Sequence, residues 1–503
     1  MARGMDLSTL LRRAIGPDAA PPETVGVRIT DICGDSRRAT NGSLFVAVAG
    51  GHVDGAGFIA DAVRRGASAV ATESKTVSAG QTIVIRVADA RLALARLAAA
   101  FHRLDEIQDR GEMRAVGITG TNGKSTIAHM VRAILRAAGR RPAMLGTIEY
   151  DLVGRLIPAD LTTPDPVTLT RHIVEAHEAG ARDLVMEVSS HSLAQRRTDG
   201  IRYDVGVFTN LTQDHLDYHP NWQDYLSAKR RLFEGLAPQA TAIINADDPA
   251  SATIVQGCRA AIARYGIENR ADLFGEILSA KLTGCRFLLK DRGEAIEIET
   301  NLVGRHNVSN ALAAAAVGRA LGIDLATIRT ALAGIRLVPG RLQRVEADGL
   351  GFDVFVDYAH TEDALRNVLR ALRPFTRGRL WCVFGCGGDR DRMKRPLMAR
   401  AVAEGADAFV ITSDNPRTED PLAILADIER GLEAGNQQRV ATIPDRAKAI
   451  GYAIERLTAG DALVIAGKGH EDYQILGTSR IDFDDVETAR AAIEARAGRT
   501  VSQ

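Results

Sequence analysis

The sequence predicts an α/β protein built from three domains. Short apolar runs rich in β-branched residues alternate with helical patterns along most of the 503 residues, as is typical of mainly parallel sheets covered by helices. A chain of this length is expected to divide into roughly three domains. At 114–135 a predicted strand is followed by a glycine-rich loop and then by a helix, which is the order of elements in a nucleotide-binding core. We therefore expect a central parallel sheet of the P-loop ATPase type at 109–338, flanked by a smaller domain at 1–108 and a Rossmann-like domain at 339–503.

The central domain is expected to open with a strand at 114–119 and a helix from about Ser125. Apolar residues in this helix recur at i, i+3, i+4, i+7 and i+8 from Ile127, which predicts one buried face. The alternation from 285 to 303 indicates antiparallel strands, and an alanine-rich helix should begin near Asn310. Further strands are expected at 184–188, 205–209 and 242–245.

The flanking domains show the same alternation. In the first hundred residues, 44–48 reads as a strand and 59–65 as a helix, and the polar stretch 105–112 is expected to be a linker. After a turn at 338–340, a helix should end before Pro374. The strands expected in the last domain are 352–357, 380–385, 408–412 and 462–466.

Composition narrows the classes of function. Lys and Arg total 63, equal to Asp and Glu, so a general nucleic-acid or anionic-membrane binder is disfavoured. The five scattered cysteines form no C-x-x-C pair, which argues against a zinc site and suits a reducing compartment. Arg12 and Arg13 interrupt the apolar residues near the N-terminus, and no apolar run approaches membrane-spanning length. We expect a cytoplasmic protein.

The segment 117–125, Gly-Ile-Thr-Gly-Thr-Asn-Gly-Lys-Ser, predicts a phosphate-binding loop. Glycines let the backbone curl so that its N–H groups point at phosphate oxygens, and the next helix adds a favourable dipole. Lys124 would reach the β- and γ-phosphates, and the Ser125 hydroxyl would bind Mg²⁺. The strict G-x-x-x-x-G-K-S/T spacing is not met, because position 118 is Ile.

The form of this loop resembles that of the Mur ligase family, the ATP-dependent amide-forming enzymes of peptidoglycan assembly. Further family motifs follow in order along nearly the whole chain: Glu187-Val-Ser-Ser-His191, 210–219, Asn245-Ala-Asp-Asp248, 304–310 and Asp357-Tyr-Ala-His360. The resemblance implies that ATP binds to the loop residues Gly120, Thr121, Asn122, Gly123, Lys124, Ser125 and Thr126.

The resemblance also implies a catalytic and metal-binding set. Glu187 and His215 each follow an expected strand, where α/β sheets gather ligands, and with Ser125 they would hold Mg²⁺. The lysine that matches Lys229 is carbamylated in the family, from CO2, and this anion helps to hold a second Mg²⁺. Lys124, Glu187, His215 and Lys229 are thus the implied catalytic residues.

The far side of the nucleotide is implied in the same way. Asn307 would contact the adenine, Arg341 the phosphates and Asp357 the ribose hydroxyls. Since the last two residues follow the turn at 338–340, ATP would lie between the central and C-terminal domains.

Two further motifs bear on the nucleotide-sugar substrate. The first domain resembles the uridine-nucleotide domain of the ligases that add the third amino acid, in the motif Asp35-Ser36-Arg37 and the segments 44–48 and 51–55 that follow it. Folylpolyglutamate synthases lack this domain. The uridine diphosphate would lie against Ser36, Gly51, His52 and Val53. The muramoyl-peptide would contact the central-domain residues Thr162, Thr163, Ser189, Gln195 and Arg197.

The motif Asp414-Asn415-Pro416-Arg417 resembles the amino-acid signature of the ligases that add meso-2,6-diaminopimelate. Arg417 can pair bidentately with the distal carboxylate that lysine lacks, while Asp414 and Asn415 offer oxygen acceptors to the distal ammonium group. The resemblance adds Arg390, Gly467 and Glu471 to this pocket.

The implied reaction joins diaminopimelate to the D-glutamate γ-carboxyl group of UDP-N-acetylmuramoyl-L-alanyl-D-glutamate through an acyl phosphate, with His360 as a candidate proton carrier. Three alternatives remain open: a lysine-adding ligase, a P-loop kinase and a catalytically inactive sugar-nucleotide sensor. The expected partners are these small molecules and ATP, with no nucleic acid and no membrane insertion. We expect a monomer.

Overall fold

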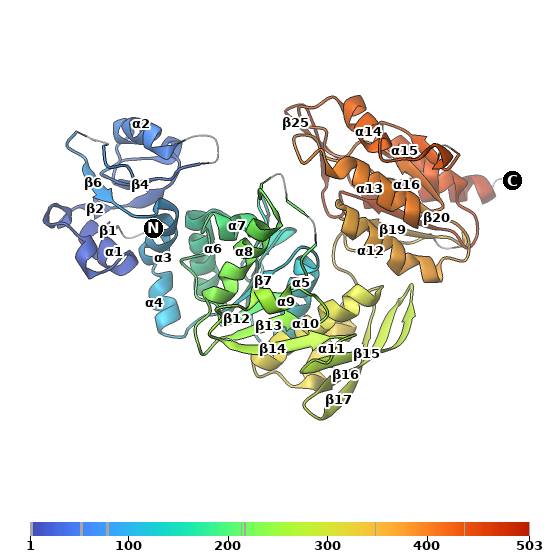
Figure 1. Ribbon diagram of the computed structural model, residues 1–503, viewed down its shortest axis with the longest axis horizontal. Helices are drawn as coiled ribbons and strands as arrows, with labels where there is room; N and C mark the ends of the chain where they lie inside the picture. The colour runs from blue at the N-terminus through green and yellow to red at the C-terminus, as the bar shows by residue number, and fades with distance from the viewer. Residues whose placement is uncertain are drawn as a thin grey trace.

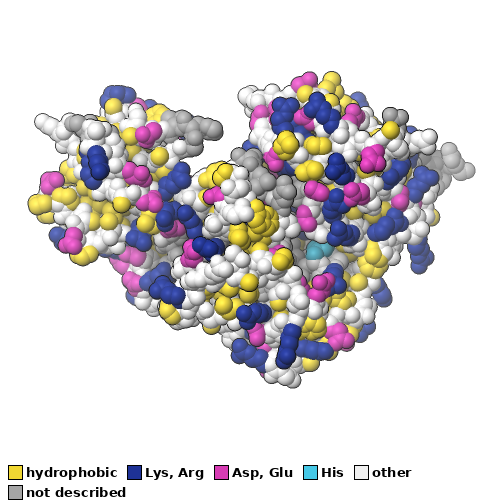
Figure 2. Space-filling model, viewed as in Figure 1, with side chains coloured by type: hydrophobic (Ala, Val, Ile, Leu, Met, Phe, Trp, Pro, Cys, Tyr) yellow, Lys and Arg dark blue, Asp and Glu magenta, His cyan; other side chains and the backbone are white. Residues whose placement is uncertain are grey.

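The computed structural model describes residues 4–50, 54–76, 80–212, 214–215, 218–347, 349–436 and 438–501. The chain forms three lobes in sequence order: blue, then green and yellow, then orange and red (Figure 1). Each lobe contains a sheet with parallel strands and covering helices, so the predicted three-domain α/β architecture is confirmed. No helix within these residues is long and apolar enough to cross a membrane. Figure 2 shows basic and acidic side chains interspersed over one face of all three lobes.

The N-terminal domain is a small parallel sheet covered by helices. Its elements are β1 (Met5–Asp6), α1 (Leu7–Ala14), β2 (Arg28–Ile29), β3 (Asp31–Cys33), β4 (Ser43–Ala47), α2 (Ile59–Arg64), β5 (Ala69–Thr72), β6 (Ile83–Arg86) and α3 (Ala90–Phe101). The parallel strands have the order β3-β4-β5-β6, and β1 pairs with β2 in an antiparallel ladder. Apolar residues of α1 and α3 bury one face of this sheet.

The segment expected to be a linker connects α3 to β7 and contains a helix that was not predicted, α4 (Leu104–Asp109). Leu104 and Ile107 lie three residues apart on one face of the helix and are buried. They join an apolar cluster that includes Tyr203 of the central domain. The short apolar face therefore holds this polar segment against the second lobe.

The central domain is built on an 11-stranded mixed sheet. Its elements are β7 (Arg114–Thr119), α5 (Lys124–Ala137), β8 (Pro142–Leu145), β9 (Glu149–Asp151), β10 (Leu156–Pro158), α6 (Pro166–Glu178), β11 (Asp183–Glu187), α7 (Ser190–Ala194), β12 (Val205–Phe208), α8 (Trp222–Glu234), β13 (Thr241–Asn245), α9 (Ser251–Ile254), β14 (Ala261–Gly266), β15 (Leu273–Lys281), β16 (Gly284–Asp291), β17 (Glu294–Thr300), α10 (Arg305–Ala320) and α11 (Leu325–Gly334). The strand order is β10-β9-β8-β11-β7-β12-β13-β14-β15-β16-β17. The strands from β8 to β15 in this order are parallel, and antiparallel strands extend both edges.

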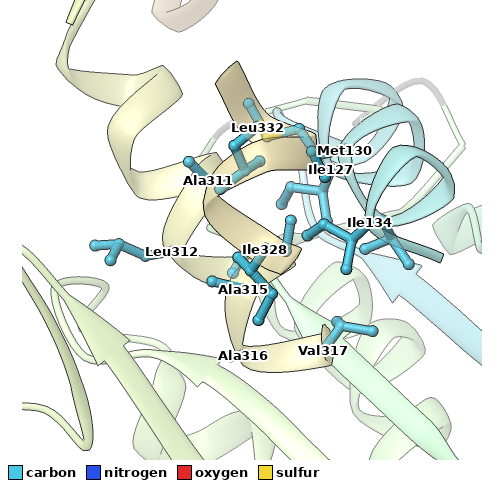
Figure 3. Close-up of a cluster of buried hydrophobic side chains, with 14 of the residues drawn as sticks. Ile127, Met130, Ile134, Ala311, Leu312, Ala315, Ala316, Val317, Ile328 and Leu332 are labelled. Atoms are coloured by element: carbon cyan, nitrogen blue, oxygen red, sulfur yellow. The ribbon is translucent and has the colours of Figure 1, made fainter. Parts of the chain in front are cut away.

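Three helices pack tightly on one face of this sheet and fix the start of α5. Ile127 and Ile134 of α5, Ala311 of α10 and Ile328 of α11 lie in one buried cluster (Figure 3). Small side chains on α10 allow the close approach, since a Cβ on Gly318 would lie 3.0 Å from Ile328 Cδ1 and 3.1 Å from Ile134 Cγ2. Close packing of this kind leaves the helices little freedom to shift. The loop before α5 therefore has a rigid support.

The C-terminal domain is a second α/β unit. Its elements are β18 (Gln343–Val345), β19 (Asp353–Asp357), α12 (Glu362–Leu372), β20 (Leu380–Phe384), α13 (Lys394–Gly405), β21 (Ala408–Ile411), α14 (Pro421–Glu429), β22 (Val440–Thr442), α15 (Arg446–Arg456), β23 (Ala462–Ala466), β24 (Tyr473–Leu476), β25 (Ser479–Asp482) and α16 (Asp485–Val501). The sheet order is β18-β19-β23-β20-β21-β22, parallel except for β18, and β24 and β25 form a separate hairpin. The four strands expected here are confirmed to within one residue at each end.

Candidate active site

A cavity of about 650 Å³ lies between the central and C-terminal domains. Parallel strands gather functional residues at their carboxyl ends, and the walls of the cavity follow the ends of β11, β20, β21 and β23. The predicted site residues that line it are Thr162, Thr163, Ser189, Arg197, His215, Arg390, Asp414, Asn415, Arg417, Gly467 and Glu471. The fold thus brings the residues predicted for the muramoyl-peptide and those predicted for the amino acid to one space.

The predicted phosphate loop connects β7 to α5. Gly120 has φ +146°, and a Cβ at this position would collide with Thr209 Oγ1, so only glycine fits the turn. Lys124 Nζ donates to the carbonyl oxygens of Gly120 at 3.0 Å and Thr121 at 2.7 Å. The loop therefore curls around the side chain of its own lysine.

A second lysine reaches the same loop from α8. Lys229 is buried, and its Nζ donates to the carbonyl oxygen of Gly120 at 2.8 Å and lies 4.4 Å from the centre of the Tyr225 ring. Desolvation, reinforced by the positive charge of Lys124, lowers the pKa of Lys229 well below its ordinary value. Burial favours the neutral amine, which is the form that reacts with electrophiles.

Residues of the C-terminal domain extend to the phosphate loop. Arg341 Nη2 donates to Ser125 Oγ at 3.0 Å, and its guanidinium group lies 4.7 Å from the centre of the Tyr358 ring. Asp357 accepts hydrogen bonds from the backbone N–H groups of Leu342 at 2.7 Å and Ala359 at 2.8 Å. Asp357 therefore shapes the turn that carries Arg341.

Asn307, predicted to contact adenine, is buried in the first turn of α10. Its Nδ2 donates to the carbonyl oxygen of Val303 at 2.8 Å, and its Oδ1 accepts from Asn310 at 3.0 Å. A Cβ on Gly123 would lie 2.6 Å from Asn310 Oδ1. Asn307, the residue predicted to contact adenine, is thus connected through Asn310 to the phosphate loop.

Glu187 stands at the last position of β11. Its carboxylate accepts from the backbone N–H of Thr147 at 2.8 Å and from the Thr147 hydroxyl at 3.0 Å. His215 has φ +56° and lies with its ring centre 4.7 Å from that of His191. Burial lowers the pKa of His215 to about 3, despite the opposing charge of Asp214, so its imidazole is neutral.

The predicted magnesium ligands have suitable chemistry but form only part of a shell. The Ser125 hydroxyl and the Glu187 carboxylate supply the oxygen donors that Mg²⁺ prefers. Among the described residues, no group of three or more His, Cys, Asp and Glu side chains has the geometry to hold a metal ion. The oxygen donors of Ser125 and Glu187 therefore fit Mg²⁺ as one part of its coordination shell.

The residues predicted for the muramoyl-peptide form one hydrogen-bonded network. Thr163 Oγ1 donates to the carbonyl oxygen of Glu187 at 2.9 Å and accepts from the N–H of Ser189 at 3.2 Å. Arg197 donates to Thr163 O at 2.9 Å and, in a forked pair, to Gln195 Oε1 at 2.9 and 2.6 Å. Gln195 does not line the cavity but orients Arg197, which does.

Two loops join to form the predicted amino-acid pocket. The N–H of Gly388 donates to the carbonyl oxygen of Asn415 at 2.9 Å, and Arg417 Nη1 donates to the carbonyl oxygen of Gly388 at 2.8 Å. A Cβ on Gly388 would collide with the carbonyl oxygen of Pro416. Behind them, the buried Arg395 pairs with Glu419 at 2.8 Å. The loop that carries Arg390 is thus fixed against the loop that carries Arg417.

The floor of this pocket contains two carboxylates and a buried lysine. Asn415 Nδ2 and Lys468 Nζ both donate to Glu471 Oε2, at 2.9 and 3.0 Å. Gly467 has φ +118°, and a Cβ there would lie 2.8 Å from Asp414 Oδ2. Burial and the negative charge of Asp414 raise the pKa of Glu471. Lys468 was not among the predicted site residues.

Some predicted residues lie elsewhere. Ser36 is buried at the start of a short 3₁₀ helix (Ser36–Arg38) in the N-terminal domain and does not line the cavity. Gly51, His52 and Val53 lie outside the described residues. Sequence reasoning missed several lining residues, among them His191, Tyr358, Lys394 and His470. The first two stand within family motifs and could have been found from them, whereas Lys394, on α13, has no local signal.

Comparisons with known proteins agree with this architecture. Family models match the chain in three consecutive segments: "Mur ligase family, catalytic domain" at 28–102, "Mur ligase middle domain" at 118–318 and "Mur ligase, glutamate ligase domain" at 340–469. A curated relative from Geobacillus thermodenitrificans is 44% identical over 98% of this chain and all of its own length. The chain belongs to the Mur ligase family.

Several of the similar proteins within the Mur ligase family have the same name. The Geobacillus protein is a UDP-N-acetylmuramoyl-L-alanyl-D-glutamate–2,6-diaminopimelate ligase. A protein of that name from Geobacter metallireducens is 43% identical over 96% of this chain and 97% of its own. A solved structure of such a ligase has 34% identity and a TM-score of 0.69, covering 97% of this chain and 99% of its own.

More distant structures share the fold alone. A MurF structure from Acinetobacter baumannii is 20% identical, with a TM-score of 0.63 over 98% of this chain and 99% of its own. The folylpolyglutamate synthase of Mycobacterium tuberculosis, solved with ADP and AMPPCP, is 21% identical with a TM-score of 0.60. It covers 78% of this chain and 93% of its own.

Proposed function

We propose that this Mur ligase joins meso-2,6-diaminopimelate to the D-glutamate γ-carboxyl group of UDP-N-acetylmuramoyl-L-alanyl-D-glutamate, with ATP as the energy source. Curated relatives with this name match nearly the whole chain. The observation that carries the proposal is that the Asp414–Arg417 segment lines the same cavity as Thr162, Thr163 and Arg197. Amide formation requires that the two substrates meet in one enclosed space.

The pocket favours diaminopimelate over lysine because of its charges. The distal end of diaminopimelate has an ammonium and a carboxylate group. Asp414 and Glu471 provide negative charge for the ammonium, and Arg417 and Arg390 provide guanidinium groups for the carboxylate. Lysine would leave the arginines without that partner, and a site built for a polar group rejects an analogue that lacks it.

Acyl-phosphate formation is assigned to the residues around the phosphate loop. Lys124 and Arg341 supply positive charge beside the Ser125 end of α5, where the γ-phosphoryl group is transferred to the D-glutamate carboxylate. Asn307 is assigned to the adenine and Asp357 to the ribose. The diaminopimelate amine then attacks the acyl carbon and phosphate leaves, so no covalent bond to the enzyme is needed.

Magnesium completes this site in the proposal. Ser125, Glu187 and His215 would hold the ion, which neutralises the charge that develops on the transferring phosphoryl group. Lys229 as a carbamate would add the missing anion. Its neutral amine nitrogen attacks the carbon of CO2 and loses one proton, so a cation site becomes an anionic ligand. The burial of Lys229 favours the amine form that this step requires.

The N-terminal domain is assigned to the uridine diphosphate, with Ser36, Gly51, His52 and Val53 as its expected contacts. Thr162, Thr163, Ser189, Gln195 and Arg197 are assigned to the muramoyl-peptide. A monomer in the cytoplasm is part of the proposal, and the five free cysteines suit a reducing compartment.

An ATP-consumption screen across amino acids tests the function directly. The assay contains UDP-N-acetylmuramoyl-L-alanyl-D-glutamate, ATP and Mg²⁺, and mass spectrometry identifies the product. We expect ADP formation to depend on both acceptor and diaminopimelate, with an amide product. Preference for lysine would identify a lysine-adding ligase, a phosphorylated product without amide would identify a kinase, and no ADP under any condition would identify a sensor.

A further inference from the structure

We propose that Lys468 is a positioning residue that sets the charge of the amino-acid pocket and thereby its preference for a substrate with a distal carboxylate. This inference rests on the proposed function. Lys468 lies two residues after the end of β23, in the loop that also carries Gly467 and Glu471. Its side chain is completely buried, so it acts through its neighbours and not through a contact with the substrate.

The contacts of Lys468 converge on the predicted specificity residues. Its Nζ lies 3.0 Å from Glu471 Oε2, 3.3 Å from Asn415 Oδ1 and 3.8 Å from Asp414 Oδ1. Three of the residues expected to read the amino acid are therefore arranged around one ammonium group. A structural lysine placed at random would not meet all three.

Lys468 also determines how the Asn415 amide is oriented. Asn415 Oδ1 accepts from Lys468 and from the N–H of Ile475 at 3.0 Å, so the Asn415 NH₂ group must point the other way. It then donates to Glu471 Oε2 at 2.9 Å. With Oε2 occupied by Asn415 and Lys468, Glu471 Oε1 remains for the ammonium group of the amino acid.

The charges explain the expected selectivity. Asp414 and Glu471 contribute two negative charges to the pocket floor, and Lys468 offsets one of them. The nearby buried Arg446 is already paired with Asp485 at 2.7 Å. Without Lys468 the floor carries one more negative charge, which repels a distal carboxylate and favours a substrate that ends in an ammonium group alone.

The test compares diaminopimelate and lysine as substrates for wild type and Lys468→Met. We expect kcat/KM for diaminopimelate to fall by about 30-fold or more, mostly through KM, since one buried charge-assisted contact is lost. The kcat/KM ratio of diaminopimelate to lysine should fall by at least about tenfold. KM for ATP should stay within about twofold, because the contacts of Lys468 with Glu471, Asn415 and Asp414 include none of the residues assigned to ATP. Lys448→Met, at an exposed lysine of α15, is the matched control.

The same substitution is also made in a Glu471→Gln protein, so that the role of Lys468 can be tested even if the single Lys468→Met variant does not fold. Glu471→Gln and Glu471→Gln/Lys468→Met complete a double-mutant cycle, and the double variant removes both members of the Lys468–Glu471 ion pair together. Adding Lys468→Met to Glu471→Gln should again lower the diaminopimelate-to-lysine ratio. An unchanged ratio in both backgrounds, with wild type making the diaminopimelate product, would overturn the role of Lys468 alone. A wild type that makes no such product would overturn the proposed function itself.

Discussion

Lys124 and Lys229 donate hydrogen bonds to the same atom, the carbonyl oxygen of Gly120, at 3.0 and 2.8 Å. Two ammonium groups so close to one another are unfavourable. Desolvation lowers the pKa of Lys124, and desolvation together with the charge of Lys124 lowers the pKa of Lys229. The arrangement favours a neutral amine at one of them. Of the two, Lys229 is the more completely buried.

Lys229→Ala should abolish amide formation, because the proposed magnesium site loses its anionic support. Added short-chain carboxylates should restore part of the activity by occupying the place of the carbamate. The measurement is ADP and amide production with and without such carboxylates, with Lys290→Ala, an exposed lysine of β16, as the control. Near-normal turnover of the variant in bicarbonate-depleted buffer would contradict the assignment.

Lys124→Ala should chiefly lower the rate of acyl-phosphate formation, by about 10²-fold or more, and weaken ATP binding as a second effect. The side chain is held within the curl of the phosphate loop by Gly120 and Thr121. Single-turnover ADP formation at saturating ATP separates the two effects. Wild-type ADP production under that condition would mean that the loop has been misassigned.

Arg417→Ala should cost more with diaminopimelate than with lysine, since only the former presents a distal carboxylate. Loss of one buried charge-assisted pair costs about 2–5 kcal/mol, roughly 30- to several-thousand-fold in kcat/KM. The measurement is kcat/KM for both amino acids at saturating ATP and UDP-linked acceptor. Arg456→Ala, at an exposed arginine of α15, is the control.

Arg417 also has a structural contact that could account for a loss of activity. Arg417 Nη1 donates to the carbonyl oxygen of Gly388, so the same guanidinium group supports the neighbouring loop. An equal loss with both amino acids would mean that Arg417 acts through loop shape and does not read the carboxylate.

Acid should destabilise the N-terminal domain through His102, at the end of α3. Burial lowers the pKa of His102 from 6.5 to about 4, with a further contribution from Arg171. The folded state therefore disfavours the charged form, and the stability present above pH 6.5 is lost as pH falls toward 4, by at most about 3 kcal/mol. Calorimetric melting from pH 4 to 8 should show a shallower pH dependence for His102→Gln than for wild type. Parallel curves would exclude this histidine as a source of acid sensitivity.

Local patterns predicted the elements well. The strand at 114–119 and the strand at 462–466 have the expected ends, because apolar runs between turn signals report burial directly. The helix expected near Asn310 begins five residues earlier, at Arg305. The helix within the linker was not predicted, because the two buried apolar residues of α4, Leu104 and Ile107, stand in a polar context.

The site was predicted only where a motif marks it. Asp414 and Arg417 stand together in the sequence, so a family resemblance could single them out. Nothing in the sequence around Lys468 distinguishes it from an ordinary surface lysine, and its hydrogen-bond partner Asn415 is 53 residues away. Burial of a charged side chain depends on such long-range partners, and one sequence does not show which residues will meet.

Two glycines at the amino-acid pocket, Gly467 in the wall of the cavity and Gly388 in the loop beside it, limit how this enzyme can escape inhibition. At Gly388 any side chain would collide with Pro416, and at Gly467 the backbone has φ +118° beside Asp414. An inhibitor bound across these positions would lie against main chain, and a substitution that displaced it would also deform the surface proposed to bind the amino acid. Resistance by point mutation should therefore arise away from these two positions, at side chains whose loss the reaction tolerates.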